Sequence, residues 1–405
     1  MVKKGNTQGK NNEVIQHQNR LLVLRLIRER KVISRVELAE LTGLKQATIT
    51  NIINELIKND YVLETGLIEG KNGRRVKGLC LNTDKSRILV ARINSEYHAV
   101  GIYDLDANCI KAEKVFWESE SSFEEMMETV RDQFLNMKES YGKDKQIIGA
   151  GVVIGGSITT VDPEFQSRLE GSLEKYITEY FTRELDMEVY VNNMSNMSGY
   201  LEWNRLEAEK KKIKTLVTLM VGYSIDCAVI FNGVVLKGKN GRAGHFGHVS
   251  IDVNGPECEC GNRGCINGYI SVRAVKKRWA ELLKYYPNPE LKADCNIRDI
   301  IKAYYSGELI ARIIYHDVAE KLGVVIANLI NQFNPEEVII GDEIPNTDEF
   351  INLVRENAKS RLPLHRFEKT KIEIFKYERK IINDVGMKGM CLFVINEQMK
   401  NMMLE

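Results

Sequence analysis

Residues 247–265 read GHVSIDVNGPECECGNRGC, and they hold one histidine and three cysteines at the spacing of a metal site. Cys258 and Cys260 flank a single residue, and Cys265 follows after a turn that begins and ends in glycine. We expect a preceding strand to bring His248 to the same point. Three thiolates and one imidazole are typical ligands of tetrahedral zinc, and four protein ligands leave no open position for catalysis. The sequence therefore predicts a structural zinc ion held by His248, Cys258, Cys260 and Cys265.

Buried free cysteines or a disulfide would be the other explanation of this cluster. Eight cysteines in 405 residues are too few for a disulfide scaffold, and the N-terminal residues do not read as a secretory signal. No apolar run is long enough to cross a bilayer. This cysteine usage predicts a cytoplasmic protein, and the length allows more than one domain.

Charge is unevenly distributed along the chain. The formal net charge is +1, but residues 1–80 hold 15 lysine and arginine residues against 8 aspartate and glutamate residues, a net charge of +7. The rest of the chain has 42 basic against 48 acidic residues, a net charge of −6. A basic head on an acidic body predicts that the head binds a polyanion.

The head has the pattern of a helix-turn-helix. Apolar residues recur at helical spacing between Leu22 and Ile27, and residues 34–37 have the form of a capping box that opens a second helix, which ends at Gly43. A third helix is expected over residues 45–59, because its apolar residues follow the i, i+3, i+4, i+7 pattern of one buried stripe. Its opposite face is polar, which is typical of a helix that reads base edges in the major groove.

Two short strands are expected after the third helix, at residues 61–64 and 76–80, around a loop over residues 66–73. The tip of this loop is basic, so it would form a wing that contacts phosphates or the adjacent minor groove. A winged helix-turn-helix is therefore predicted for residues 1–80, with double-stranded DNA as its partner. The expected DNA contacts are Ser34, Arg35, Lys45, Gln46, Ala47, Thr48, Thr50, Asn51, Asn54, Lys71, Asn72, Gly73, Arg74 and Arg75.

A three-helix protein-interaction domain with a solvated hairpin is the alternative for the head. Helix-turn-helix shape alone would not exclude it. The order of the helices, the basic wing and the excess of positive charge together favour DNA binding.

Beyond the head, strands and helices alternate in two cycles. The first has a meander of three strands between residues 87 and 117, a helix over residues 123–141 and a buried strand over residues 147–154. The second begins with a strand at residue 215 and contains the metal segment. This alternation predicts an α/β body with two lobes and a ligand site in the cleft between them. We place the first lobe at residues 81–195, with residues 381–405 packing back onto it, and the second lobe at residues 196–380.

The stretch NGRAGHFGHVSIDVNGPECECGNRGC, residues 240–265, resembles the signature and zinc segment of the ROK family, named for repressor, open reading frame and kinase. The wing sequence NGRRV, residues 72–76, is similar to that of the repressors in this family, and the branch that the chain resembles is the xylose-repressor type. The resemblance covers nearly the whole chain. It implies a winged helix-turn-helix joined to a two-lobed α/β body of the sugar-kinase or actin-like type, which is ribonuclease H-like.

The resemblance also implies where catalysis would take place. Family kinases carry an aspartate as general base in the strand-to-helix segment that here reads VNNMSN, residues 191–196, and the aspartate position holds Met194. A thioether cannot accept a proton from a sugar hydroxyl. The two turns that would bind phosphate are altered as well, at residues 92–94 and 222–226, where Asp226 would repel a polyphosphate. We therefore expect no catalytic residue and no ATP binding.

The sugar site that the resemblance implies is altered too. Family members hold sugar hydroxyls with two glutamates, and those positions are His245 and Asn267 here. Both side chains can hydrogen-bond a hydroxyl, but in a different geometry from a carboxylate. Either a sugar binds in a changed pose or the pocket is kept only as scaffold. The candidate effector-binding residues are Gly155, Gly156, Asn193, His245, His248 and Asn267.

Together these features predict a transcription factor that represses genes for carbohydrate use, with xylose or another sugar or oligosaccharide as effector. The resemblance implies a homodimer or a dimer of dimers, and a two-fold assembly fits a palindromic operator. Two other functions stay open, namely a regulator without an effector and an ATP-dependent sugar kinase.

Overall fold

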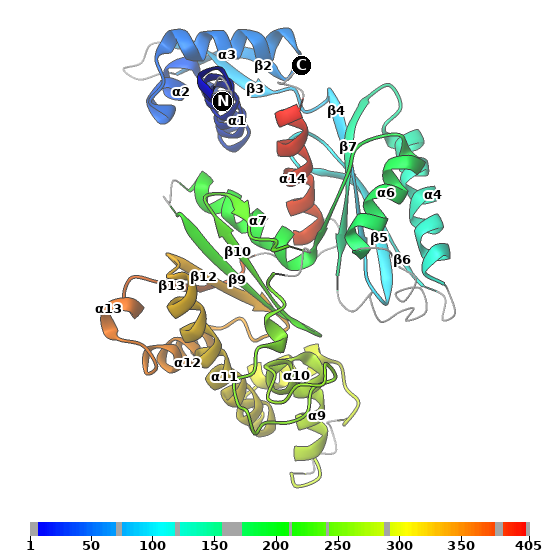
Figure 1. The fold of residues 1–405 in the computed structure, drawn as a ribbon, viewed down its shortest axis with the longest axis vertical. Helices are drawn as coiled ribbons and strands as arrows, with labels where there is room; N and C mark the ends of the chain where they lie inside the picture. Colours follow the sequence, from blue (N-terminus) through cyan, green and yellow to red (C-terminus); the bar gives the residue numbers. More distant parts are fainter. Residues whose placement is uncertain are drawn as a thin grey trace, which may run out of the picture. The chain divides into compact units, whose positions relative to one another are not determined.

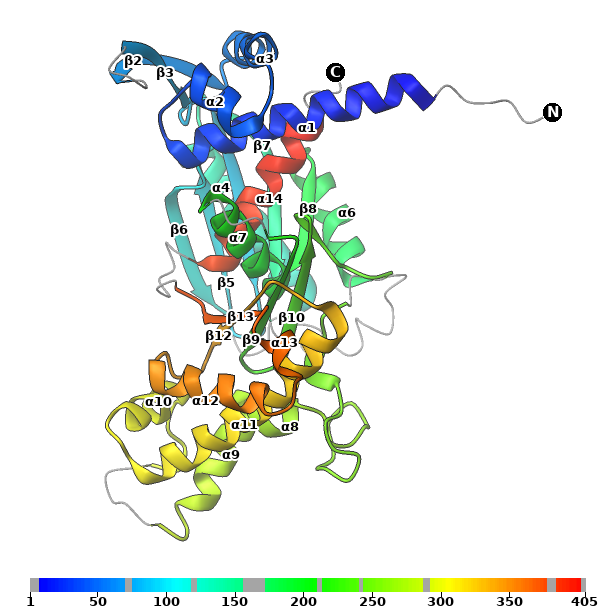
Figure 2. The ribbon, with the colours of Figure 1, turned by 90° about the vertical axis from the view of Figure 1, so that its left-hand side faces the viewer.

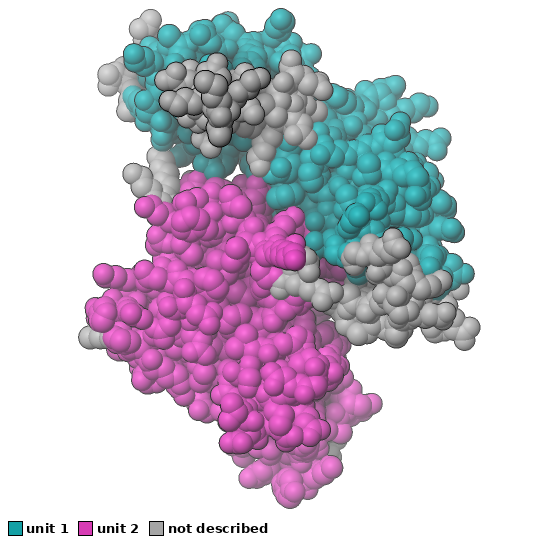
Figure 3. All heavy atoms as spheres, in the orientation of Figure 1, with its two compact units in different colours: residues 1–153, 162–191, 380–405 teal, residues 154–161, 192–379 magenta. Residues whose placement is uncertain are grey.

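The computed structural model describes residues 7–69, 75–117, 122–155, 172–209, 213–239, 243–286, 292–376 and 384–401. The chain forms two compact units (Figure 3). Residues 1–153, 162–191 and 380–405 form the first unit, and residues 154–161 and 192–379 form the second. Residues 1–80 thus belong to the same unit as the first lobe, and the long segment of the second unit begins at residue 192, whereas the sequence predicts a boundary after residue 195.

The head contains the three helices that the sequence predicts, in the predicted order (Figures 1 and 2). The capping box is present: the Ser34 hydroxyl accepts the N–H of Glu37 at 3.2 Å, and the Glu37 carboxylate accepts the N–H of Ser34 at 2.9 Å. A short strand before the second helix joins the hairpin, which gives a sheet in the order β1-β3-β2. The elements are α1 (Thr7–Arg30), β1 (Ile33–Ser34), α2 (Arg35–Thr42), α3 (Gln46–Lys58), β2 (Val62–Glu69) and β3 (Arg75–Leu81).

The first lobe is a five-stranded sheet in the order β6-β5-β4-β7-β8 with helices on both faces (Figure 1). The C-terminal helix α14 packs closely on one face, since a Cβ at Gly151 of β7 would lie 2.3 Å from Met390 Cγ. Helices α4 and α6 cover the other face. The elements are β4 (Ser86–Ile93), β5 (Tyr97–Tyr103), β6 (Cys109–Phe116), α4 (Phe123–Tyr141), β7 (Gln146–Ile154), α6 (Leu173–Leu185), β8 (Val189–Asn193) and α14 (Val385–Asn401).

The second lobe has a sheet in the order β11-β10-β9-β12-β13, in which β9 runs antiparallel to β10 and parallel to β12. Helix α7 packs on one face, so closely that a Cβ at Gly199 would lie 2.7 Å from the Thr218 hydroxyl oxygen. The elements are α7 (Met194–Ala208), β9 (Thr215–Val221), β10 (Ile225–Phe231), β11 (Val234–Val235), η3 (Phe246–His248), α8 (Asn267–Ile270), α9 (Val272–Leu282), α10 (Ile297–Tyr305), α11 (Leu309–Phe333), β12 (Glu337–Asp342), α12 (Asp348–Lys359), α13 (Leu364–Phe367) and β13 (Lys371–Ile374).

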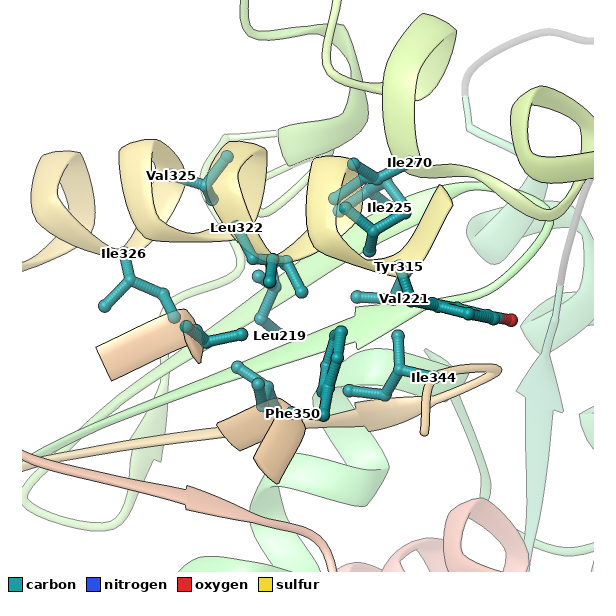
Figure 4. Packing of buried hydrophobic residues seen from close by; sticks show 14 of the residues in the cluster. Leu219, Val221, Ile225, Ile270, Tyr315, Leu322, Val325, Ile326, Ile344 and Phe350 are labelled. Atoms are coloured by element: carbon teal, nitrogen blue, oxygen red, sulfur yellow. The ribbon is translucent and has the colours of Figure 1, made fainter. Parts of the chain in front are cut away.

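The hydrophobic core of the second unit lies on the other face of this sheet (Figure 4). Alternate residues of β9, among them Leu219 and Val221, point toward Leu322 of α11 and Phe350 of α12. Because the metal segment runs from η3 to α8, and Ile266 and Ile270 are part of the same core, the cluster is anchored to the body of the lobe. None of the helices in the described part of the chain combines the length and apolar character that a membrane crossing needs.

Candidate functional site

The third helix of the head presents a polar face to solvent. Its apolar stripe is buried, with Ile49 and Ile53 fully covered, and Arg20 of α1 donates two hydrogen bonds to Glu55, which fixes the two helices together. On the opposite face Thr50 uses its hydroxyl within the helix, donating to the Gln46 carbonyl at 2.9 Å. The predicted contacts on this face that are exposed are Lys45, Gln46, Ala47, Thr50, Asn51 and Asn54, while Thr48 is half-buried.

Ser34 is not available as a DNA contact, which corrects one prediction. Its side chain is 2% exposed and makes the capping box with Glu37. The hydroxyl accepts the Glu37 N–H as the N-cap of α2 and donates its own proton to the Glu37 carboxylate at 2.8 Å, so it has no proton left for a phosphate. Arg35, the next residue, is half-buried in the first turn of α2.

The hairpin after α3 is longer than the sequence suggests. β2 continues to Glu69, so residues 66–69 of the predicted loop over residues 66–73 are strand, and the pairing has a bulge between Glu64 and Leu67. The bulge interrupts the alternation of side chains, which hid the second half of β2. Arg75 is exposed at the start of β3. The remaining predicted wing contacts, Lys71, Asn72, Gly73 and Arg74, lie outside the described residues.

The four predicted zinc ligands converge on one point. Their donor atoms all lie within 4.8 Å of one another. The Sγ atoms of Cys260 and Cys265 are 3.7 Å apart, and His248 Nδ1 is 3.6 Å from Cys258 Sγ. Ligand bonds of about 2.1–2.3 Å in a tetrahedron place neighbouring donors roughly 3.6–3.8 Å apart, so these spacings fit zinc. One expectation is wrong: His248 comes from the 3-10 turn η3 and not from a strand.

Two glycines permit the backbone path around the cluster. Gly264 has a φ of 66°, and a Cβ there would lie 1.6 Å from the Asp252 carbonyl oxygen. Gly244, just before His245, has a φ of 96°, and a Cβ there would lie 1.9 Å from the Cys227 carbonyl oxygen. Any other residue at these positions would be strained and would also collide with backbone atoms. The glycines of the signature are thus required by the path that brings His248 and Cys265 together.

The candidate effector residues are partly committed to the scaffold. The Asn267 Oδ1 atom accepts the N–H of Ile225 at 2.9 Å, and the Asn193 Oδ1 atom caps α7 by accepting the N–H of Asn196 at 2.8 Å. A ligand could therefore use mainly the amide nitrogens of these two residues. His248 turns Nδ1 toward Cys258, which leaves Nε2 for another contact. Gly155 is buried, and Gly156 lies outside the described residues.

His245 stands at the position of one of the two expected glutamates, and its ring lies near the carboxylate of Asp226. Its Nδ1 atom is 3.6 Å from Asp226 Oδ1, and the Ser224 hydroxyl donates to Asp226 Oδ2 at 2.7 Å. The turn between β9 and β10 is thereby filled with polar side chains of its own. A polyphosphate would meet the Asp226 carboxylate at this turn.

Two further positions bear on catalysis. Met194 is half-buried as the first residue of α7, where the sequence places it. At the first hairpin of the first lobe, Arg92 forms an ion pair with Asp384, the residue that caps α14. The Asn94 side chain accepts the N–H groups of Glu96 and Tyr97, so it closes the turn between β4 and β5. Side chains of the protein therefore occupy both turns that would bind phosphate in a kinase.

Sequence comparison decides the family, because the ROK family profile matches residues 92–397, well over half of the chain. The chain belongs to the ROK family. A winged helix-turn-helix DNA-binding profile matches residues 16–62. These matches confirm the resemblance and the fold class that the sequence predicts.

Similarity to individual ROK proteins extends over both the head and the body. The chain is 29% identical over 383 residues to the xylose repressor of Caldicellulosiruptor bescii, which covers 92% of this chain and 95% of the relative. It is 25% identical over 381 residues to the dual regulator NagC of Escherichia coli K12, covering 87% and 86%. A solved ROK transcriptional regulator, a homolog of the E. coli MLC protein, has a TM-score of 0.77 at 20% identity, covering 96% of this chain and 99% of that one. Solved ROK kinases share the fold of the body.

One polar group near the predicted DNA contacts of this ROK protein is not predicted from the sequence. The Glu64 carboxylate on β2 accepts hydrogen bonds from Arg35 and from Lys77 on β3. The three residues are 13 to 42 positions apart in the chain, so only the pairing of the strands brings them together. An acidic residue inside a basic segment is the one signal that could have drawn attention to Glu64.

Proposed function

We propose that this ROK protein is a repressor that binds operator DNA through its winged head and controls genes for carbohydrate use. The observation that carries this proposal is the exposed polar face of α3 opposite an apolar stripe in which Ile49, Ile52, Ile53 and Leu56 are buried. The match to a winged helix-turn-helix profile and the likeness to sugar-related repressors support it. We further propose that it acts in the cytoplasm as a homodimer or a dimer of dimers on a palindromic operator.

We propose a DNA-binding face made by the first turn of α2, the exposed side of α3 and the wing. Cationic side chains at its edges would contact phosphates, and the amides of Asn51 and Asn54 would contact base edges. Ser34 is left out because its hydroxyl caps α2. The proposed contacts are Arg35, Lys45, Gln46, Ala47, Thr48, Thr50, Asn51, Asn54, Lys71, Asn72, Gly73, Arg74 and Arg75.

Footprinting and fluorescence anisotropy on the promoter of the protein's own gene and of its neighbours test this proposal. We expect a protected, two-fold-related sequence whose affinity falls steeply as salt rises, because phosphate contacts release counterions. Absence of salt-dependent binding to any of these promoters would refute the repressor assignment.

We propose that the effector is a sugar, with D-xylose as the first choice because the xylose repressor of C. bescii is similar over nearly the whole chain. The polar groups available to the sugar are the His245 ring, the Nε2 atom of His248 and the amide nitrogens of Asn193 and Asn267. A thermal-shift screen with mono- and oligosaccharides distinguishes a sugar-inducible repressor from a regulator without an effector. A sugar that raises the melting temperature and releases the operator establishes the inducible form, and a screen with no such sugar favours the other.

A kinase function is the alternative that the fold of the body raises. We expect no turnover in a coupled assay with ATP and common sugars, because Met194 cannot act as general base and Asp226 stands at the phosphate turn. Turnover of any of these sugars by the purified protein, lost on removal of ATP, would overturn our interpretation of both turns.

A further inference from the structure

Glu64 lies where three parts of the head meet. Its strand β2 pairs with β3, β3 pairs with β1, and α2 begins directly after β1 at Arg35. One oxygen of the Glu64 carboxylate accepts a hydrogen bond from Arg35 Nη2 at 2.8 Å, and the other accepts one from Lys77 Nζ at 2.5 Å. A single acidic side chain therefore holds two cations, one from α2 and one from β3.

A β-bulge shapes the backbone beside Glu64. The bulge that follows Glu64 in β2 places Thr65 over Gly78 of β3, where a Cβ would lie 2.3 Å from the Thr65 hydroxyl oxygen. Bulges change the direction in which nearby side chains point. The hydrogen bonds from Lys77 and Arg35 also hold the pKa of Glu64 below its ordinary value, so the carboxylate stays charged at neutral pH. Glu64 thus provides a fixed negative charge between two cations.

The position of this charge matters for a polyanion. Arg35 and Lys77 are 28% and 63% exposed, and both belong to the elements of the proposed DNA-binding face. Each phosphate that a lysine or arginine neutralises releases counterions and strengthens binding to any DNA sequence. A carboxylate that pairs with these cations weakens that contribution, and it also repels phosphates directly.

We propose that Glu64 limits the affinity of the head for DNA phosphates by keeping Arg35 and Lys77 paired within the protein. The inference rests on the proposed DNA-binding face and adds to it a residue that weakens binding. The effect is independent of the DNA sequence, because none of Glu64, Arg35 and Lys77 is assigned to base edges. A lower affinity for phosphates alone leaves more of the repressor free to reach its operator among the large excess of other sites.

Anisotropy measurements on the full-length protein with a random-sequence duplex of about 30 base pairs test this inference. For Glu64→Gln we expect binding about three- to tenfold tighter near 0.1 M salt, and a salt dependence steeper by about one contact per head. Glu64→Asp keeps the charge, so its affinity should stay near that of wild type. Adding Arg35→Ala to Glu64→Gln should remove part of the gain, since Arg35 is one of the two cations released and Lys77 stays free.

Asp60→Asn is the matched control. Asp60 is exposed on the turn after α3 with a φ of 58°, a backbone conformation that asparagine also adopts readily. The change removes the same unit charge from the same head, four residues before Glu64 and outside β2. We expect a much smaller gain in affinity than for Glu64→Gln. Melting temperatures of all variants check that each one is folded.

The outcomes separate this inference from the proposed function. If the wild-type protein binds no DNA in a salt-dependent manner, the proposed DNA-binding face is wrong. If the wild type binds but Glu64→Gln binds no tighter, or Asp60→Asn gains as much, then DNA binding stands and the role of Glu64 is refuted.

Discussion

Replacing Asn51 by alanine is expected to weaken operator binding about tenfold to a hundredfold while leaving binding to random-sequence DNA nearly unchanged. Asn51 lies on the exposed face of α3, opposite the buried stripe of Ile49 and Ile53. An asparagine amide can pair with both the N6 and N7 atoms of an adenine, and one such pair contributes about 1–3 kcal/mol of discrimination. The loss of affinity should therefore appear for the operator, while the salt dependence of binding should stay unchanged.

Anisotropy with the footprinted operator and with a random duplex of the same length measures this difference. Asn59→Ala is the control, because Asn59 is the exposed residue at the C-terminal cap of α3. The interactions that the structure describes for it involve its backbone alone, with the N–H donating to the Glu55 carbonyl and the carbonyl accepting from Lys85. It should bind both duplexes like the wild type. Equal losses on operator and random DNA would mean that Asn51 contacts phosphate, and no loss on either would show that Asn51 does not read a base.

The helices of the head were predictable because their signals are local. Ser34 and Glu37, which lie three positions apart, mark the start of α2. The helical spacing of the apolar residues in α3 marks its buried side. The same holds for α4, whose bounds agree with the predicted range and which begins after a second capping box at Ser122. Contacts between distant residues gave no such signal. The ion pair of Arg92 and Asp384 joins residues 292 positions apart, and it depends on how α14 packs on the first sheet.

At the candidate sites, the sequence predicted which residues gather but not what each side chain does there. The four zinc ligands fall within 18 residues, so their convergence follows from a short segment. Ser34 was assigned to DNA because its hydroxyl suits a phosphate, yet the same hydroxyl caps α2 in the fold. Asn267 was assigned to an effector, and its oxygen accepts a backbone N–H from β10 instead. A side chain with two compatible roles is resolved only by the neighbours that tertiary packing supplies.

We propose that the cysteine and histidine cluster holds one structural zinc ion, and Cys265→Ser is expected to lose the metal and to lower the melting temperature by roughly 10–20 °C. Cys265 is buried, and its neighbours Ile266 and Ile270 belong to the core of the second unit. Metal binding of this kind contributes directly to folding, and loss of even 3–5 kcal/mol corresponds to about this shift in a domain of this size. Zinc would join the segment from η3 to α8 into one rigid loop, so its loss would expose that side of the core.

Elemental analysis of protein purified without chelator, together with thermal melting, measures both parts of this prediction. We expect about one zinc per wild-type chain and almost none in Cys265→Ser. Cys295→Ser is the control, because Cys295 is a half-buried cysteine that packs against the same core but is outside the cluster. It should keep its zinc and lose far less stability, since a sulfur-to-oxygen change in the core leaves the metal loop intact. Wild-type protein without zinc, or a Cys265→Ser variant that melts with the wild type, would show that hydrogen bonds and packing alone hold residues 247–265 in place.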